Sequence, residues 1–98
     1  MNNNAEGHKK VCYELNRIYN EKNHDYGDAF AESYHDYGLI VAAIRIGDKY
    51  KRLHNICARN AELKVSDETI RDTLLDLANY CIMTVMAMDA EGEPYAKR

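Results

Sequence analysis

Residues 67–88 read DETIRDTLLDLANYCIMTVMAM, and this stretch is the clearest indication of the fold class. Its apolar side chains recur in steps of four and three, which is the spacing of one face of an α-helix. A second apolar line runs beside the first, so the apolar face is broader than a small single domain usually needs. We therefore predict a helix over residues 66–90 and expect part of its apolar face to meet another subunit. The first line, the apolar seam, consists of Ile70, Leu74, Leu77, Cys81, Val85 and Met88, and the second consists of Leu75, Ala78, Ile82 and Met86.

Two more helices are predicted upstream. Regular apolar spacing indicates a helix over residues 6–22. Another is predicted over residues 29–59, with a pause at Gly38 and with Asp28 as its N-cap. The predicted fold class is therefore all-α, with three helices packed as a small bundle that oligomerisation completes.

Length and composition indicate one ordered domain. The 98 residues include only one proline and 46% of them are hydrophobic, which is typical of a soluble helical chain. We predict a single domain over residues 1–98, with a core over about residues 11–88 and short flexible termini. The net charge of −3 argues against direct binding of polymeric nucleic acid, because few counterions would be released. The longest apolar stretch, residues 39–44, is far shorter than the roughly 20 residues of a membrane span.

Three cysteines bear on the compartment. Cys12, Cys57 and Cys81 are far apart and form no Cys-x-x-Cys pair, so neither a zinc site nor a disulfide framework is predicted. Each lies in an apolar segment, and we expect free thiols that pack in the core as small hydrophobes. Free thiols fit a reducing compartment, so the predicted location is the cytoplasm.

Two charged stripes lie on neighbouring predicted helices. Glu68, Asp72 and Asp76 follow one another at intervals of four, and no lysine or arginine follows within reach of Asp76. Spacing leaves two interpretations open for this acidic column and the basic stripe before it. The stripes either pair as salt bridges or stay solvated, or else the cations bind phosphate and the three acids hold Mg²⁺. The preceding stripe consists of Arg45, Asp48, Lys49 and Arg52.

The connection after the first helix is rich in polar residues. A capped turn accounts for Gly27 and Asp28. It does not account for the crowding of other polar side chains beside them, among which Tyr26 could stack on a nucleobase. This segment is therefore also a candidate ligand-binding site. Its candidate residues are Lys22, Asn23, Asp25, Tyr26 and Asp28.

Three motifs occur in order along the chain. They are Lys22-Asn23-x-Asp25-Tyr26-Gly27-Asp28, Arg45-x-x-Asp48-Lys49-x-x-Arg52-Leu53, and Asp67-Glu68-x-Ile70-x-Asp72-Thr73-Leu74-x-Asp76-Leu77-Ala78-Asn79-Tyr80. Together they resemble the nucleotide modification associated domain, type 1, a family of small proteins encoded largely by phages and prophages. The resemblance covers about residues 11–88 and implies a role near nucleotide metabolism or DNA modification.

A more distant similarity is to the all-α NTP pyrophosphohydrolases of MazG type. Those oligomeric enzymes hold Mg²⁺ with a Glu-x-x-Glu on one helix and a Glu-x-x-Asp on another. The counterparts here are Asp25-x-x-Asp28 and Glu68-x-x-x-Asp72, and neither has the same spacing. This similarity therefore favours nucleotide binding over hydrolysis.

The function we predict is that of a small phage-type protein, homo-oligomeric in the host cytoplasm, which holds a phosphorylated nucleotide between helices or subunits. It would serve modified-nucleotide metabolism, or it would sequester a nucleotide immune signal as an anti-defence protein. Arg45, Lys49 and Arg52 would bind phosphate, while Asn23 and Tyr26 would contact the base or sugar. Two alternatives stay open: a Mg²⁺-dependent NTP pyrophosphohydrolase, and a helical interaction module without a ligand.

Overall fold

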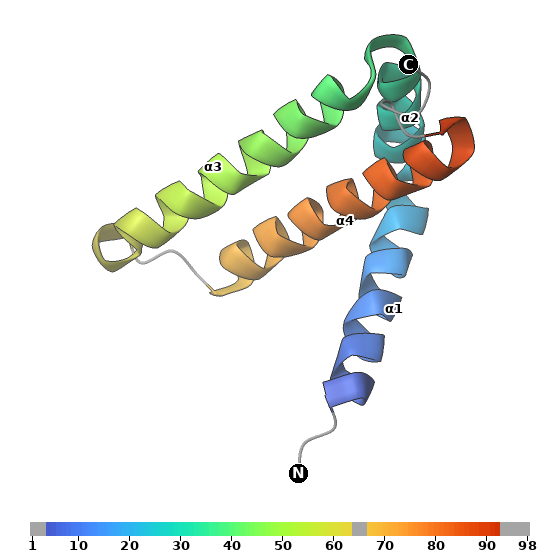
Figure 1. Cartoon of the computed structure of the whole chain (residues 1–98). Helices are drawn as coiled ribbons and strands as arrows, with labels where there is room; N and C mark the ends of the chain where they lie inside the picture. The colour runs from blue at the N-terminus through green and yellow to red at the C-terminus, as the bar shows by residue number, and fades with distance from the viewer. Residues whose placement is uncertain (1–3, 64–66, 93–98) are drawn as a thin grey trace.

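The computed structural model describes residues 4–63 and 67–92, without the side chains of residues 25, 26, 59–63, 67 and 68. Within these ranges the elements are all helical, which confirms the predicted all-α fold class. Figure 1 shows α3 and α4 as an antiparallel hairpin, with α1 and α2 stacked end to end beside it. The elements are α1 (Asn4–Lys22), the π-helix η1 (Asn23–Gly27), α2 (Asp28–Tyr37), α3 (Leu39–Leu63) and α4 (Asp67–Glu91).

The predicted helix over residues 29–59 is divided, so the prediction of three helices is wrong. Gly38 ends α2 with φ 82° and ψ −161°, a backbone conformation that essentially only glycine adopts. Its N–H donates to the carbonyl oxygen of Tyr34 at 2.8 Å, and the chain then reverses into α3. Helix α3 continues to Leu63, four residues beyond the predicted end. The predicted pause at this glycine is therefore a true break between two helices.

No capped turn separates the first two helices in the structure. The chain continues through the π-helix, and Gly27 rather than Asp28 occupies the N-cap position of α2, without a side-chain cap bond. The carboxylate of Asp28 instead accepts a hydrogen bond from Asn23 Nδ2 at 3.2 Å. The glycine permits this path because a Cβ at residue 27 would lie 2.3 Å from Asn23 Oδ1. A π-helix of one turn is uncommon and often accompanies a functional site.

The core lies where α2, α3 and α4 meet. Phe30, Tyr34 and Ala42 are buried there together with Met83 and Ala87. The Phe30 ring also meets the Tyr80 ring edge-on, with 5.7 Å between centroids. This core anchors α2 against the α3–α4 hairpin.

Helix α4 packs with a different face inward from the one predicted. Much of the apolar seam points away from the other helices, so Leu74 and Val85 remain 46% and 56% exposed, whereas Met88 packs against the core. The buried face carries the polar Thr73, Asn79 and Thr84 beside the apolar Leu75, Met83 and Ala87. Each of these polar groups is satisfied: both threonine hydroxyls donate to the carbonyl four residues earlier, and Asn79 Nδ2 donates to the carbonyl of Leu15. Burial therefore costs these side chains little, and a polar face can line the interior.

The three cysteines also differ from the prediction. Cys12, Cys57 and Cys81 are all exposed free thiols and none lies in the core. The reason is the same rotation of apolar faces, because Cys81 belongs to the outward-facing seam. Apolar spacing is thus a correct helix signal here, but it does not identify the buried side.

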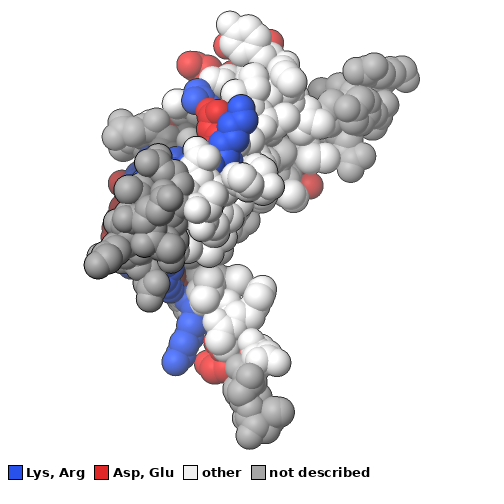
Figure 2. All heavy atoms as spheres, turned by 90° about the vertical axis from the view of Figure 1, so that its left-hand side faces the viewer, with Lys and Arg blue, Asp and Glu red and all other residues white. Residues whose placement is uncertain are grey.

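Helix α1 stands apart from the rest of the chain. It crosses α4 near its own middle, where Leu15 is buried, and its N-terminal half projects as an arm (Figure 1). The radius of gyration is 15.5 Å, against about 13 Å for a globular chain of this length. Figure 2 shows the arm at the lower end, with charged side chains along it and a mostly uncharged surface above. None of the described helices is both long and apolar enough to cross a membrane.

Candidate functional site

Two polar contacts fix the crossing of α1 and α4. Asn79 Nδ2 of α4 donates to the Leu15 carbonyl oxygen of α1 at 3.2 Å, and both residues are buried. Arg71 of α4 donates through both terminal nitrogens to the two carboxylate oxygens of Glu14, at 2.6 and 2.7 Å. A paired, two-pronged contact of this kind holds its partners in one geometry.

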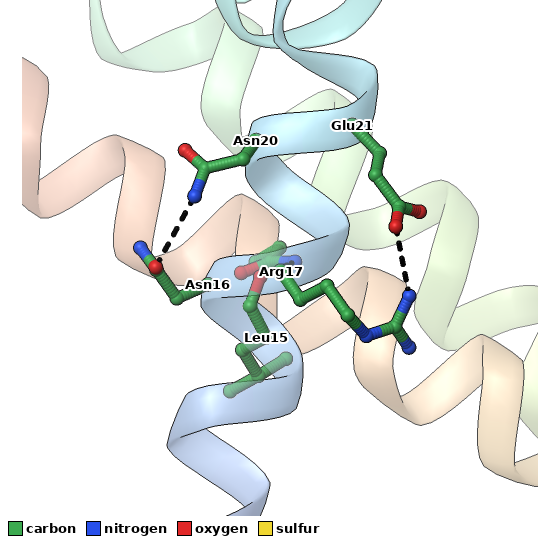
Figure 3. Close-up of polar contacts among 6 residues, drawn as sticks. Leu15, Asn16, Arg17, Asn20 and Glu21 are labelled. Atoms are coloured by element: carbon green, nitrogen blue, oxygen red, sulfur yellow. Dashed lines mark hydrogen bonds and ion pairs between the residues drawn. The ribbon is translucent and has the colours of Figure 1, made fainter.

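The crossing leaves a hollow on each side of α1, and the two hollows differ in chemistry. One, the polar notch, has a volume of about 370 Å³, and the other, the apolar notch, has about 250 Å³. Figure 3 shows why: Arg17 and Glu21 project from one side of α1, while Asn16 and Asn20 project from the other. The polar notch is lined by Glu14, Arg17, Ile18, Lys22, Asp72, Leu75 and Asp76. The apolar notch is lined by Cys12, Leu15, Asn16, Tyr19, Asn79, Ile82 and Met86.

The pair of Glu14 and Arg71 makes the crossing sensitive to pH. The hydrogen bonds from Arg71 lower the pKa of Glu14 below 4.5. The pair therefore stabilises the fold fully above pH 4.5, and this stabilisation is lost as the pH falls through the folded-state pKa. We expect the difference in Tm between wild type and Glu14→Gln to shrink as the pH is lowered from 7 to 3. A difference that stays constant over this range would contradict the assignment, and Glu32→Gln, at an exposed site on α2, is the control.

A second set of polar contacts joins α4 to α3. Lys49 Nζ lies 3.4 Å from Asp76 Oδ2, and both side chains are only 30% exposed. Arg52 Nε donates to the Thr73 hydroxyl at 3.3 Å. The salt-bridge interpretation of the two stripes therefore holds for Lys49 and Asp76. Asp76 is shared, because it meets Lys49 of α3 and also lines the polar notch beside α1.

Arg45 and Asp48, the other two residues of the basic stripe, lie close to Tyr80. Burial raises the pKa of the Tyr80 hydroxyl, the positive charge of Arg45 lowers it, and the negative charges of Asp76 and Asp48 raise it further. The contacts of Lys49 with Asp76 and of Arg52 with Thr73 form a polar band between α3 and α4. Arg45 and Asp48 are exposed, so they form the solvent edge of this band. The band runs along the inner face of α4 from the polar notch to α3.

The structure brings some of the predicted site residues together and separates others. Lys22 comes from the first motif and shares the polar notch with Asp72 and Asp76 of the third. Asn23 and Asp28 bond each other in the π-turn instead of facing that notch. The side chains of Asp25, Tyr26 and Glu68 lie outside the described residues.

The predicted metal site is only partly defined. In residues 4–63 and 67–92, with the side chains noted above excepted, no three His, Cys, Asp or Glu residues cluster as metal ligands. Asp72 and Asp76 nevertheless line one hollow, one helical turn apart. Mg²⁺ is commonly held by one or two carboxylates together with substrate phosphates and water. Two carboxylates therefore suffice if a phosphate completes the coordination.

Sequence reasoning missed the contribution of α1. Glu14 and Arg17 line the polar notch, and Arg71 closes one end of the crossing through Glu14. On a single helix, Glu14 and Arg17 look like an ordinary solvated polar face. The signal that could have found them is weak: their spacing places them on the same side of the helix as Glu21 and near Lys22.

The comparisons with known proteins address the family. No curated protein and no solved structure matches the chain. A family model described as nucleotide modification associated domain 1 matches residues 22–88. The match starts at Lys22 and spans all three motifs, so it contains the α4 half of the polar notch, whereas Glu14 and Arg17 lie before it. Because it covers most of the 98 residues, the chain belongs to the nucleotide modification associated domain 1 family.

Proposed function

We propose that this protein binds a phosphorylated nucleotide in the polar notch between α1 and α4. The observation that supports this most is the meeting of Lys22 with Asp72 and Asp76, from two separate motifs of the family, in one hollow. A cation beside two carboxylates fits a phosphate group that is bridged to Mg²⁺. The volume of about 370 Å³ lies at the lower end of the range of about 300–1,000 Å³ for small-molecule sites.

The phosphates interact with the cations of α1 in this proposal. Lys22 supplies one positive charge and Arg17 a second, planar one that suits bidentate contact. Arg17 pairs with Glu21 at 3.0 Å, but both side chains are about 60% exposed, and such pairs are weak enough to exchange for phosphate. The base and sugar extend toward the π-turn, whose residues Asn23, Asp25, Tyr26 and Asp28 follow Lys22 in the chain.

The α3 stripe holds the acidic side of the notch in place. Lys49 contacts Asp76, and Arg52 contacts Thr73, so both cations orient α4. Arg45 and Asp48 at the exposed edge of the same band complete the predicted ligand-contacting set. Glu68 is the third proposed Mg²⁺ ligand beside Asp72 and Asp76.

The description of the family supports a role near nucleotide modification, and the biological role we propose builds on it. We propose a homo-oligomer in the cytoplasm of an infected or lysogenic bacterium, which either handles modified nucleotides or sequesters a nucleotide signal. Binding is favoured over hydrolysis because Asp25-x-x-Asp28 and Glu68-x-x-x-Asp72 differ in spacing from the two acidic motifs of the MazG-type pyrophosphohydrolases. A ligand-free interaction module is favoured only if no nucleotide binds.

A panel of linear and cyclic nucleotides tests the proposal, with thermal shift and calorimetry performed with and without Mg²⁺. A bound nucleotide raises Tm by linkage. We expect Lys22→Ala to weaken binding about 10- to 100-fold, since a hydrogen bond to a charged group contributes about 1.5–3 kcal/mol. Asp72→Asn should remove the Mg²⁺-dependent part of the affinity and spare the rest.

Lys51→Ala is the matched control, because Lys51 is an exposed lysine of α3 away from the notch. Its affinity should equal that of wild type. Unchanged affinity in Lys22→Ala would place the ligand elsewhere. Mass spectrometry of the bound fraction separates the two activities: an intact nucleotide supports sequestration, and a monophosphate formed only with Mg²⁺ supports hydrolysis.

A further inference from the structure

Part of the apolar seam of α4 lacks a partner among the described residues, although Met88 at its end packs against the core. Leu74 and Val85 are 46% and 56% exposed, and the Cys81 thiol is also exposed. The two other sides of α4 are occupied, one by α3 and the other by the crossing helix α1. The exposed apolar side chains of α4, Leu74, Ile82, Val85 and Met86, form a patch of the kind that marks protein–protein interfaces.

We propose that two copies of this chain pair through the seam, with the two α4 helices antiparallel about a two-fold axis. The seam is centred near residue 79, and its spacing reads almost the same in both directions. Reversal therefore places Leu77 opposite Cys81 of the second copy and brings the exposed Leu74 close to Val85 of the second copy. A self-complementary surface of this kind is what a two-fold interface requires. This inference does not depend on nucleotide binding.

The charges beside the seam favour the antiparallel direction. Arg71 and Asp89 lie on the same flank of α4, 18 residues or five turns apart, so they cannot meet within one chain. In an antiparallel pair the same flanks of the two helices face each other with their ends reversed. Arg71, which already donates to Glu14 but has a side chain that is 54% exposed, therefore lies beside Asp89 of the second copy, twice in the dimer. A parallel pair would keep these opposite charges at opposite ends.

The available surface is also of a suitable length. The seam extends about 27 Å from residue 70 to residue 88 at about 1.5 Å per residue. Ile82 and Met86, which are 43% and 46% exposed, continue the apolar surface toward the apolar notch. Stable interfaces bury about 800 Å² per partner. A stable pair would therefore need contact along this whole length, with the flanking residues included.

The mass of the protein in solution tests the pairing, measured by light scattering on a size-exclusion column. We expect wild type to have twice the 11.3 kDa mass of one chain. Leu74→Glu and Val85→Glu should each give a monomer with unchanged helical circular dichroism, because both residues are exposed in a single chain. Ile40→Glu is the matched control: Ile40 is 59% exposed but lies on α3, so this variant should remain dimeric. A monomeric wild type, or a dimer that survives both seam variants, would overturn the proposal.

Cross-linking tests the direction. In a Cys12→Ser, Cys57→Ser background, only Cys81 can form a disulfide between copies. In the antiparallel pair the two Cys81 residues are offset by about 6 Å along the helix axis and cross-link slowly, whereas adding Leu77→Cys puts a new thiol directly opposite Cys81 of the second copy. We expect copper–phenanthroline to cross-link the Leu77→Cys variant at least tenfold faster than its background. Equal rates would indicate parallel helices and refute the antiparallel arrangement.

Discussion

Gly38→Ala is expected to lower the Tm by roughly 5–20 °C, because a non-glycine residue in this backbone region costs about 1–3 kcal/mol. Residue 38 has φ 82° and ψ −161°, and it joins α2 to α3 at the point where the chain reverses. No atom lies within 4 Å of the position of an added Cβ, so the penalty is purely one of backbone conformation. The chain can relieve it only by moving α2, which carries Phe30 and Tyr34 of the core. Thermal and urea unfolding would measure the loss.

Gly47→Ala supplies the matched control for this change. Gly47 lies inside α3, and an added Cβ there also has no atom within 4 Å. The same substitution should therefore stabilise the protein by about 0.5–1 kcal/mol, because alanine favours the helix. Opposite signs for the two variants are the expected result. A neutral Gly38→Ala would show that the break between α2 and α3 does not require a glycine.

Gly27→Ala is expected to destabilise the π-turn by about 1–3 kcal/mol, the usual cost of overpacking. The new Cβ would lie 2.3 Å from Asn23 Oδ1 and 3.0 Å from Tyr19 Cε1, so at least one of these side chains must move. Asn23 is held by its bond to Asp28, and its Oδ1 is buried without a hydrogen-bond partner among the described side chains. Because Lys22 directly precedes this turn, nucleotide affinity should fall together with stability. Chemical unfolding and calorimetry measure the two effects separately.

A double-mutant cycle identifies the cause of the Gly27→Ala effect. Asn23→Ala removes the side chain that is closest to the added Cβ. We expect the double variant to lose clearly less stability than the sum of the two single losses, since one substitution relieves the clash created by the other. Additive losses would instead attribute the effect to Tyr19 or to the helical backbone. Urea unfolding of the four proteins is sufficient.

Apolar spacing predicts where the helices of this chain lie, and local chemistry decides where that prediction fails. The spacing indicates both the length of α4 and the pause at Gly38. It does not indicate which side of α4 is buried, because it assigns apolar residues to the core by default. Thr73, Thr84 and Asn79 each find a carbonyl acceptor, so a polar face could be buried instead. Nothing in the sequence of α4 reveals that Asn79 has the Leu15 carbonyl as its partner.

The candidate site shows the same division. Lys22, Asp72 and Asp76 are among the candidate residues that the sequence motifs indicate, and the fold places these three in the polar notch. Lys49, which is predicted to bind phosphate, lies 3.4 Å from Asp76 in the structure, and its role toward a phosphate stays a prediction. The pairing of Glu14 with Arg71 cannot be predicted from the sequence, because 57 residues separate them and only the crossing of α1 over α4 brings them together.

The crossing has a consequence for the order in which the protein matures on the ribosome. Helix α1 is synthesised first, yet the groups that hold it, Arg71 and Asn79, are among the last to be made. A short helix without partners is marginal in water, so α1 waits as a fluctuating segment while the later helices emerge. The α3–α4 hairpin consequently precedes it, and the polar notch is the final part of the molecule to take shape. Nascent chains that are stalled before residue 79 has left the exit tunnel therefore contain every residue that lines the polar notch, but the notch itself has not yet formed.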